Sequence, residues 1–366
     1  MATSSPPGTD DRTVPASRTA ATVEFEHVTK RYDGRAGASA AVADLTFAVP
    51  AGKICVLVGP SGCGKTTSLK MVNRLVEPTS GRILIDGVDL ATRDVTELRR
   101  GIGYVIKKVG LFPHQTIAQN VMVVPSLLGW PESRRRERAH ELLALVGLEP
   151  ERYGDRYPAQ LSGGERQRVG VARALAADPP VMLMDEPFGA VDPIQRMRLQ
   201  DEFLRLQRGL AKTIMFVTHD IDEAIKMGDL VAVMEQGGHL AQFAPPSELL
   251  SRPATEFVAR FVGTDRGLKR LSLARVGDLP VHDVATATVD EDVADVVRRI
   301  ADDAFPYLLL VDRDRHPVGW VKRAELPGQG RLDRSAATPM SPLLESETTV
   351  KDALSLMLDA EPVVPG

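Results

Sequence analysis

The sequence is poor in cysteine and has no long apolar run. Its only two cysteines, Cys55 and Cys63, lie in and beside a glycine-rich loop. They form no disulfide framework and fit a reducing compartment. No apolar stretch approaches the roughly 18 residues that a membrane-spanning helix needs. We therefore expect any association with a membrane to go through a partner.

An excess of charge of one sign is also missing. The chain of 366 residues has 45 Lys and Arg against 49 Asp and Glu, a net charge of −4. The chain has no excess of positive charge that would attract nucleic acid, and we expect no nucleic-acid partner. Residues 1–21 are rich in Ser, Thr, Pro and Ala without an apolar core segment, which predicts a disordered tail and not a signal peptide. The length is sufficient for two or three domains.

Short apolar runs predict a buried parallel sheet. Three of them are continuous, as in strands buried on both faces, and helical stretches follow them. These runs are residues 54–58, 181–184 and 213–218, and the helix after the first covers about residues 65–75. Residues 23–28 and 45–49 alternate like half-buried strands. Strands that alternate with helices indicate an α/β fold. Between about residues 100 and 160 the pattern is largely helical, with one helix over 134–147, which predicts a helical subdomain.

The C-terminal part has a different organisation. We expect a linker over residues 265–281 and a second domain over 282–366. Its first repeat, 282–327, predicts a strand, a helix at 293–301 and strands at 307–311 and 317–321. A similar start recurs over 336–366, with a helix at 350–358, and we interpret it as an incomplete second repeat.

The strongest single motif is a phosphate loop. It consists of Gly59, Pro60, Ser61, Gly62, Cys63, Gly64, Lys65 and Thr66. Glycines let the backbone amides surround the phosphates of a nucleotide, and the helix that follows directs its positive end at them. Lys65 is predicted to reach the β- and γ-phosphates of ATP, and the Thr66 hydroxyl to hold Mg²⁺. We count Thr67 among the nucleotide-binding residues.

Two carboxylates end the second apolar run. One of the pair Asp185 and Glu186 can hold Mg²⁺ and the other can polarise an attacking water. The alternative is an acidic strand end at a solvated rim, and the phosphate loop upstream favours the catalytic interpretation. His219 follows the third run, although a lone histidine is more often structural than catalytic.

A serine and two glycines precede another helix. Ser162, Gly163, Gly164 and Glu165 have the spacing of a capping box, so the simplest interpretation is a well-capped helix. The same two glycines would also expose bare amides, which form an anion site at a helix start.

The phosphate loop, the Leu161-Ser162-Gly163-Gly164-Glu165-Arg166-Gln167 run and the acidic pair, in this order, resemble the ATP-binding cassette (ABC) family. The resemblance implies a P-loop NTPase cassette over residues 22–264, with a RecA-like core, an antiparallel β subdomain and a helical subdomain. It also implies ATP hydrolysis by a head-to-tail homodimer. In that dimer Ser162, Gly163 and Gly164 of one chain face the γ-phosphate held by the other.

The resemblance also assigns individual roles. Asp185 is expected to hold the metal, Glu186 to act as general base, and His219 to contact the γ-phosphate. Asp192 matches the loop that links the two sites of the dimer, and Tyr32 matches the aromatic residue that stacks on adenine.

One position departs from the family pattern. After Ile106 the family has glutamine, whereas this chain has Lys107 followed by Lys108. A charged lysine has three donors and no acceptor, so it cannot ligate a metal as the glutamine amide oxygen does. It could neutralise γ-phosphate charge or extend into solvent, or it could be a tolerated loop substitution. We hypothesise that the coupling between ATP state and transport is altered here.

Further segments, among them residues 110–114, 244–249 and 257–263, resemble the ATPases of osmoprotectant importers. These import glycine betaine, choline, carnitine or proline betaine. The resemblance implies integral membrane permease subunits, an indirect extracytoplasmic solute-binding protein, and a position on the cytoplasmic face of the cell membrane. Two alternatives stay open: an importer of amino acids, polyamines or another small solute, and a soluble ABC ATPase without a transport role.

The C-terminal domain resembles a cystathionine-β-synthase (CBS) module that is truncated. Where such modules often bind a ribose, the run from Gly319 has Lys322 in place of a hydroxyl residue and Glu325 in place of aspartate. The module could bind a nucleotide, respond to ionic strength through screened charge contacts, or only pack or dimerise.

Overall fold

The structure is a computed structural model, and it describes residues 20–32, 40–107, 110–189, 191–210, 212–280, 284–301, 305–340 and 343–359. The chain divides into two compact units, Met1–Arg266 and Gly267–Gly366. Most of the predicted tail, residues 1–19, lies outside the described residues, as does Lys108. In the described ranges, the structure has no helix with the length and apolar character that a bilayer span requires.

An antiparallel sheet forms one part of the first unit, in the order β2-β1-β4-β5. Its strands are β1 Val23–Lys30, β2 Val42–Val49, β4 Ser80–Ile85 and β5 Val88–Asp89. The predicted alternation in β1 and β2 places apolar side chains on one buried face. On that face the rings of Phe25 and Phe47 stack with centroids 4.7 Å apart.

A second, mostly parallel sheet carries the site, in the order β10-β9-β3-β8-β7-β6. Its strands are β3 Ile54–Val58, β6 Ile102–Val105, β7 Val181–Asp185, β8 Thr213–Val217, β9 Leu230–Glu235 and β10 His239–Ala244. Neighbours are parallel from β9 to β6, and β10 is antiparallel to β9. Every residue of β3 and β8 is buried, as their continuous apolar runs predict.

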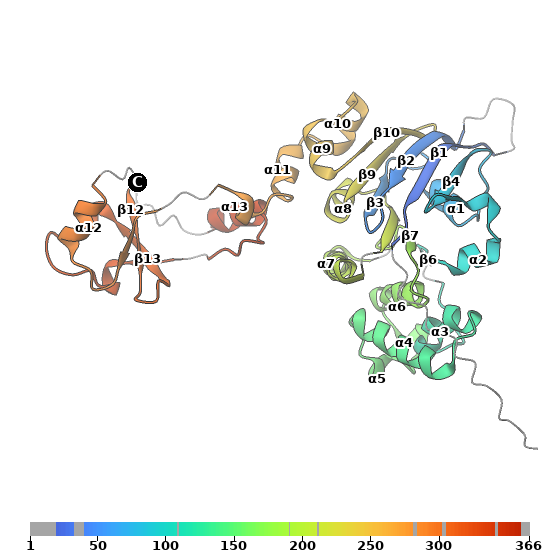
Figure 1. The fold of residues 1–366 in the computed structure, drawn as a ribbon, viewed down its shortest axis with the longest axis horizontal. Helices are drawn as coiled ribbons and strands as arrows, with labels where there is room; N and C mark the ends of the chain where they lie inside the picture. The colour runs from blue at the N-terminus through green and yellow to red at the C-terminus, as the bar shows by residue number, and fades with distance from the viewer. Residues whose placement is uncertain are drawn as a thin grey trace, which may run out of the picture. The chain divides into compact units, whose positions relative to one another are not determined.

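Some helices of the first unit pack against this sheet, and others form a separate group beside it. The helices are α1 Lys65–Val72, α2 Val95–Arg100, α3 Ile117–Leu127, α4 Glu132–Leu145, α5 Pro150–Tyr153, α6 Gly163–Leu175, α7 Pro193–Leu210, α8 Ile221–Met227, α9 Pro246–Ser251 and α10 Glu256–Val262. The helices α3, α4 and α5 lie together, and α6 packs against both α3 and strand β6 (Figure 1). This group is the predicted helical subdomain.

Three local predictions need correction. Helix α1 ends at Val72 and not near residue 75, because Arg74 adopts a left-handed φ of 52° and its guanidinium donates to the Leu90 and Arg93 carbonyls. Helix α4 covers Glu132–Leu145, shifted from 134–147, because Pro131 precedes its first turn and the chain turns at Gly147. The stretch Ile102–Val105 is a strand inside the region predicted as largely helical, because it pairs with β7.

The second unit is built on a small mixed sheet in the order β11-β12-β13-β14. Its elements are β11 Thr286–Thr288, α12 Val293–Arg299, β12 Tyr307–Val311, β13 Pro317–Lys322, β14 Thr338–Pro339 and α13 Val350–Asp359. The strand–helix–strand–strand order is the predicted one, and α12 is shorter than predicted. A core of apolar side chains from α12 and the sheet, including Val296 and Leu310, stabilises the unit.

The predicted linker contains regular structure. Helix α11, Arg266–Leu271, lies within it. The amides of Val276 and Gly277 donate to the carbonyls of Thr348 and Ser346, so this segment is bound to the start of the second repeat. The domain bounds given above stay a prediction.

Candidate nucleotide site

The predicted site residues follow the carboxyl ends of three neighbouring strands. The phosphate loop follows β3, Glu186 follows β7, and His219 comes shortly after β8. Since β3 pairs with β8 and β8 with β7, all in parallel, these segments meet at one edge of the sheet. Ligands of open α/β sheets bind at this edge.

The phosphate loop is shaped by glycines at close approaches. A Cβ on Gly59 would lie 2.1 Å from the Met234 carbonyl oxygen, and one on Gly64 would lie 2.2 Å from that of Ala41. Both have positive φ angles, so a side chain at either position would also strain the backbone. The loop therefore depends on glycine for both space and conformation.

The ammonium group of Lys65 is buried inside this loop. Its Nζ donates to the carbonyl oxygens of Gly59 and Pro60, each at 2.8 Å. It is also 3.6 Å from the Cys63 sulfur. The loop thus holds its own cation where the phosphates of a nucleotide are predicted to bind.

Two oxygen groups that could act as metal ligands meet beside the loop. The Thr66 hydroxyl donates to Oδ1 of Asp185 at 2.9 Å, which joins helix α1 to the end of β7. A hydroxyl and a carboxylate next to a phosphate site suit Mg²⁺, which prefers oxygen ligands and keeps several waters. These two residues therefore fit the predicted metal.

Glu186 has a constrained backbone and a charged neighbourhood. Its φ is 45°, which is uncommon for a residue with a side chain, and its amide donates to the Val217 carbonyl. Its Oε2 accepts from Lys107 Nζ at 2.6 Å and is 3.5 Å from Nδ1 of His219. Partial burial raises the pKa of the Glu186 carboxyl, but the hydrogen bond and charge of Lys107, with His219 and Lys65, hold it below its ordinary value.

Tyr32 lies near the start of α1, the helix that follows the phosphate loop. Its ring is exposed, its hydroxyl is 3.5 Å from that of Thr67, and the Lys30 ammonium lies 5.2 Å from the ring centre. An exposed aromatic face beside the phosphate loop is available for stacking against a base. The predicted adenine contact stays a prediction.

The Ser162 run forms the predicted capping box. The Ser162 hydroxyl accepts from the amide of Glu165, and the Glu165 carboxylate accepts from the amide of Ser162. Tyr153 also donates to Glu165, which fixes the start of α6 to α5. A Cβ built on Gly163 would meet no heavy atom of the described residues within 4 Å, so this helix start is open on one side. Among the described residues, no hydrogen bond or ion pair joins this helix start to the phosphate loop of the same chain, which leaves its amides available to a second chain.

Asp192 caps the helix that follows it. Its carboxylate accepts from the amide of Gln195 at 3.1 Å. The side chain of Gln195 approaches Gly164, whose Cβ would lie 3.2 Å from Oε1. Gln195, three residues after Asp192, therefore lies close to the start of α6, and glycine at 164 leaves room for its side chain.

Sequence reasoning missed several supporting residues. The buried Glu223 on α8 accepts from Gln200 on α7, and Lys226 pairs with Asp201 at 2.7 Å. These contacts tie the helix after His219 to the helix after Asp192. A glutamate on the buried face of a short helix was a signal for Glu223, but no pattern indicated Gln200.

Asn120, which belongs to the stretch that resembles osmoprotectant importers, has a structural role that the sequence did not indicate. Asn120 is fully buried, its amide donates to the carbonyls of Phe112, Gln115 and Thr116, and its Oδ1 accepts from the Phe112 amide. The loop over residues 112–116 is therefore held rigidly against α3.

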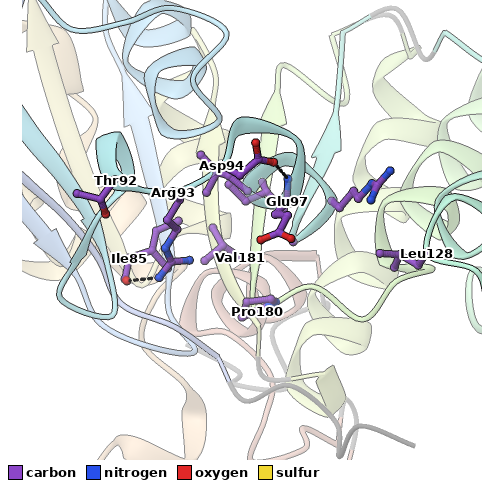
Figure 2. A pocket seen from close by; sticks show the side chains of 12 residues that line it. Ile85, Thr92, Arg93, Asp94, Glu97, Leu128, Pro180 and Val181 are labelled. Atoms are coloured by element: carbon purple, nitrogen blue, oxygen red, sulfur yellow. Dashed lines mark hydrogen bonds between the residues drawn. The ribbon is translucent and has the colours of Figure 1, made fainter. Parts of the chain in front are cut away.

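A cavity of about 730 Å³ opens at the other edge of the sheet, near the starts of β6 and β7. Figure 2 shows Arg93, which donates to the Ile85 carbonyl, and Asp94, which accepts from the Glu97 amide, among its lining residues. None of the predicted site residues lines it. It lies at the opposite ends of the strands from the predicted site residues, so we assign it no part in the chemistry.

Comparison with known families agrees with this geometry. The family model described as ABC transporter matches residues 42–189, a range that includes the phosphate loop, Lys107, the Ser162 run and the acidic pair. The model described as CBS domain matches residues 276–326. In that unit Lys322 Nζ is 3.4 Å from Oε1 of Glu325, so the two substituted residues contact each other.

Curated relatives are similar over most of the chain. The osmoprotectant import ATP-binding protein OsmV of Salmonella typhimurium is 46% identical over 340 residues, which cover 92% of this chain and 89% of the relative. The glycine betaine/carnitine/choline transport ATP-binding protein OpuCA of Bacillus subtilis is 49% identical over 314 residues, covering 86% of this chain and 81% of the relative.

Solved structures are similar over part of the chain. The ATP-binding cassette MJ0796, in a dimeric post-hydrolysis state bound to ADP and Pi, is 33% identical with a TM-score of 0.55. The match covers 61% of this chain and 98% of that one. A cassette of this fold is thus known as a dimer with a hydrolysed nucleotide.

Proposed function

This chain belongs to the ATP-binding subunits of ABC transporters for osmoprotectants, and we propose that it energises the import of a quaternary amine such as glycine betaine, choline, carnitine or proline betaine. It is an ATPase of the ABC cassette fold. The transported class is proposed because relatives at 46% and 49% identity are named for osmoprotectants and for glycine betaine, carnitine and choline.

One structural observation carries the catalytic part. Parallel strand pairing brings residues from three different segments to one edge of the sheet. These residues are Lys65, Thr66, Asp185, Glu186 and His219. Contacts join Thr66 to Asp185 and His219 to Glu186. Phosphoryl transfer needs a phosphate clamp, a metal site and a group that orients water, and this edge supplies residues for all three.

The mechanism follows from these positions. Lys65 exchanges the carbonyls of Gly59 and Pro60 for the β- and γ-phosphates of ATP. Thr66 and Asp185 would hold Mg²⁺, which would neutralise phosphate charge. Glu186 takes a proton from the attacking water while the oxygen of that water bonds to the γ-phosphorus. The bond from that phosphorus to the β-γ bridging oxygen then breaks, and His219 contacts the transferred group.

The open start of α6 supports the proposal of a head-to-tail dimer. The amides at Gly163 and Gly164 would then complete the site of a second chain. Closure of the dimer on ATP would move a pair of membrane permease subunits, and hydrolysis would reset them. We propose that the protein binds these subunits at the cytoplasmic face of the membrane, and that a solute-binding protein delivers the solute from the other side.

Reconstitution tests this function. The chain would be co-expressed with candidate permease subunits of a quaternary-amine importer, and uptake of labelled glycine betaine, choline, carnitine and proline betaine would be measured in vesicles. Uptake that needs ATP and is competed by quaternary amines supports the proposal. Competition by amino acids or polyamines alone would contradict the solute class, and failure to co-purify with any permease would contradict the transport role.

A further inference from the structure

An ion pair joins the loop after β6 to the proposed general base. Lys107 Nζ lies 2.6 Å from Oε2 of Glu186. Because β6 and β7 are parallel neighbours, the residues that follow their carboxyl ends face each other at the site. The position at which this chain departs from the family pattern therefore contacts the group that is proposed to activate water.

The carboxylate in this pair has little freedom. Its Oε2 also has Nδ1 of His219 at 3.5 Å, and a Cβ on Gly189 would lie 3.4 Å from it. The backbone at Glu186 is fixed by the bond to Val217. While the pair is closed, Lys107 occupies one of the two carboxylate oxygens and fixes the direction of the group.

The lysine, in contrast, is free to move. Its side chain is 58% exposed, whereas that of Glu186 is 18% exposed. Solvent screens the exposed ammonium and weakens its hold on the carboxylate. An ammonium on a flexible four-carbon stem can also change its direction readily. The pair can therefore be opened at small cost by a stronger anion.

The phosphates of ATP are such an anion. Lys107 is close enough to Asp185 for their charges to interact, and Lys65 is close enough to Glu186. Lys107 thus lies within reach of the field around the phosphate loop. A γ-phosphate carries more negative charge than one carboxylate and offers three oxygens.

We infer that Lys107 is a latch on Glu186 that ATP opens. Without nucleotide its ammonium is paired with the Glu186 carboxylate, and on ATP binding it transfers to the γ-phosphate. ADP lacks that phosphate and leaves the latch closed. The inference rests on the proposed ATPase function. The latch would decide when the Glu186 carboxylate becomes available to the attacking water. A neutral glutamine at this position would form neither ion pair.

Carbodiimide crosslinking of the full-length protein tests the latch. This reagent joins an amine to a contacting carboxylate as an amide, with loss of water, and peptide mass spectrometry reports the yield. The Lys107–Glu186 crosslink is expected without nucleotide and with ADP, and its yield is expected to fall at least fivefold with saturating ATP in EDTA. The internal control is the ion pair Lys53–Asp229, whose Nζ and Oδ1 atoms are 3.1 Å apart. It contains no residue of the site, and its crosslink yield should not change with nucleotide.

Three outcomes would overturn the inference. One is a Lys107–Glu186 yield that ATP leaves unchanged relative to the control pair. Another is an equal fall with ADP, because the γ-phosphate would then not be the competing group. The third is absence of the crosslink in the nucleotide-free protein, which would contradict the ion pair itself.

Nucleotide affinity provides a second measurement that does not depend on turnover. In EDTA, Lys107→Gln is expected to weaken ATP binding about threefold to tenfold, the range of a partly offset charge-assisted hydrogen bond, and to leave ADP binding within twofold. Lys107→Arg keeps the charge and should restore most of the preference for ATP. Equal losses for ATP and ADP would contradict the transfer. If the wild-type protein binds nucleotide but hydrolyses no ATP with its permease, the proposed function fails while the crosslinking result still decides the latch.

Discussion

The hydroxyl of Thr66 donates a 2.9 Å hydrogen bond to Oδ1 of Asp185. Thr66 lies in the first turn of α1 and Asp185 is the last residue of β7, so the bond joins the phosphate loop to the acidic strand end. In the absence of a cation the two groups satisfy each other. The hydroxyl oxygen keeps acceptor lone pairs while it donates to Asp185, so both groups could hold Mg²⁺ with this bond in place, and their roles can be tested through metal dependence.

Thr66→Ala removes one hard donor and leaves Asp185 without its hydrogen-bond partner. We expect the Mg²⁺ concentration for half-maximal ATPase activity to rise at least tenfold, in line with about 1.5 kcal/mol for one lost bond to a charged group. Thr66→Ser keeps the hydroxyl and serves as the matched control. An unchanged Mg²⁺ dependence in Thr66→Ala would remove Thr66 from the metal site.

Glu186→Gln removes the carboxylate that is proposed to accept a proton. The ATPase rate is expected to fall by 10²-fold or more, because general base catalysis contributes about 10²–10⁴-fold. ATP should still bind, so the variant is expected to accumulate as an ATP-bound dimer in size-exclusion chromatography. A variant that turns over ATP at the normal rate would count against Glu186 as base.

Gly163→Ala separates folding from dimer function. Within one chain the added methyl meets no described heavy atom, and alanine favours a helix over glycine by about 0.5–1 kcal/mol. We expect an equal or higher melting temperature, but at least tenfold lower ATPase activity, because the methyl would project toward the phosphate held by a second chain. Gly209→Ala, also in a helix with open space around it, is the matched control and should keep full activity. Normal ATPase activity in Gly163→Ala would argue against the proposed dimer site.

Glu223 predicts a pH-dependent stability. Burial raises the pKa of its carboxyl above the ordinary 4.5, although hydrogen bonds from Thr218 and Gln200 oppose this. Between 4.5 and the raised pKa the folded state holds the proton more tightly than the unfolded state, so stability falls as pH rises through that window. Glu223→Gln keeps the acceptor for Gln200 and removes the titration.

The measurement is urea unfolding from pH 4 to pH 8. The free energy of unfolding of Glu223→Gln, relative to wild type, is expected to increase over this range by about 1.4 kcal/mol for each unit by which the pKa is raised. The exposed Glu248 provides a control substitution to glutamine, because its carboxylate keeps its water in both states. A difference between Glu223→Gln and wild type that is constant with pH would contradict the burial effect.

Much of the nucleotide site could be predicted from the sequence because its determinants are local. A glycine loop between an apolar run and a helix, and an acidic pair after another run, each describe a strand end. Parallel pairing then brings such ends together. The contacts Thr66–Asp185 and His219–Glu186 are consistent with these motifs.

The residues that escaped prediction act between segments. Gln200 on α7 and Glu223 on α8 meet through a side-chain hydrogen bond between two helices, and neither residue has a local sequence pattern that indicates its partner. Helix ends were misplaced for a similar reason. Arg74 leaves the helical conformation to donate to Leu90 and Arg93, which lie in another segment. Ile102–Val105 is a strand because β7 offers it an edge, and four residues alone carry no such information.

The exposure of Lys107 would make the proposed latch sensitive to the salt content of the cell. A contact between an exposed ammonium and a carboxylate weakens as ions accumulate, since the screening length falls from about 10 Å at 0.1 M salt to about 3 Å at 1 M. A cell that shrinks in a concentrated medium raises its internal salt. If the proposed latch operates, dehydration would loosen the hold on Glu186 and lower the demand on ATP for opening it. The motor would then respond to loss of cell volume within its own active site, at the moment when a compatible solute is required.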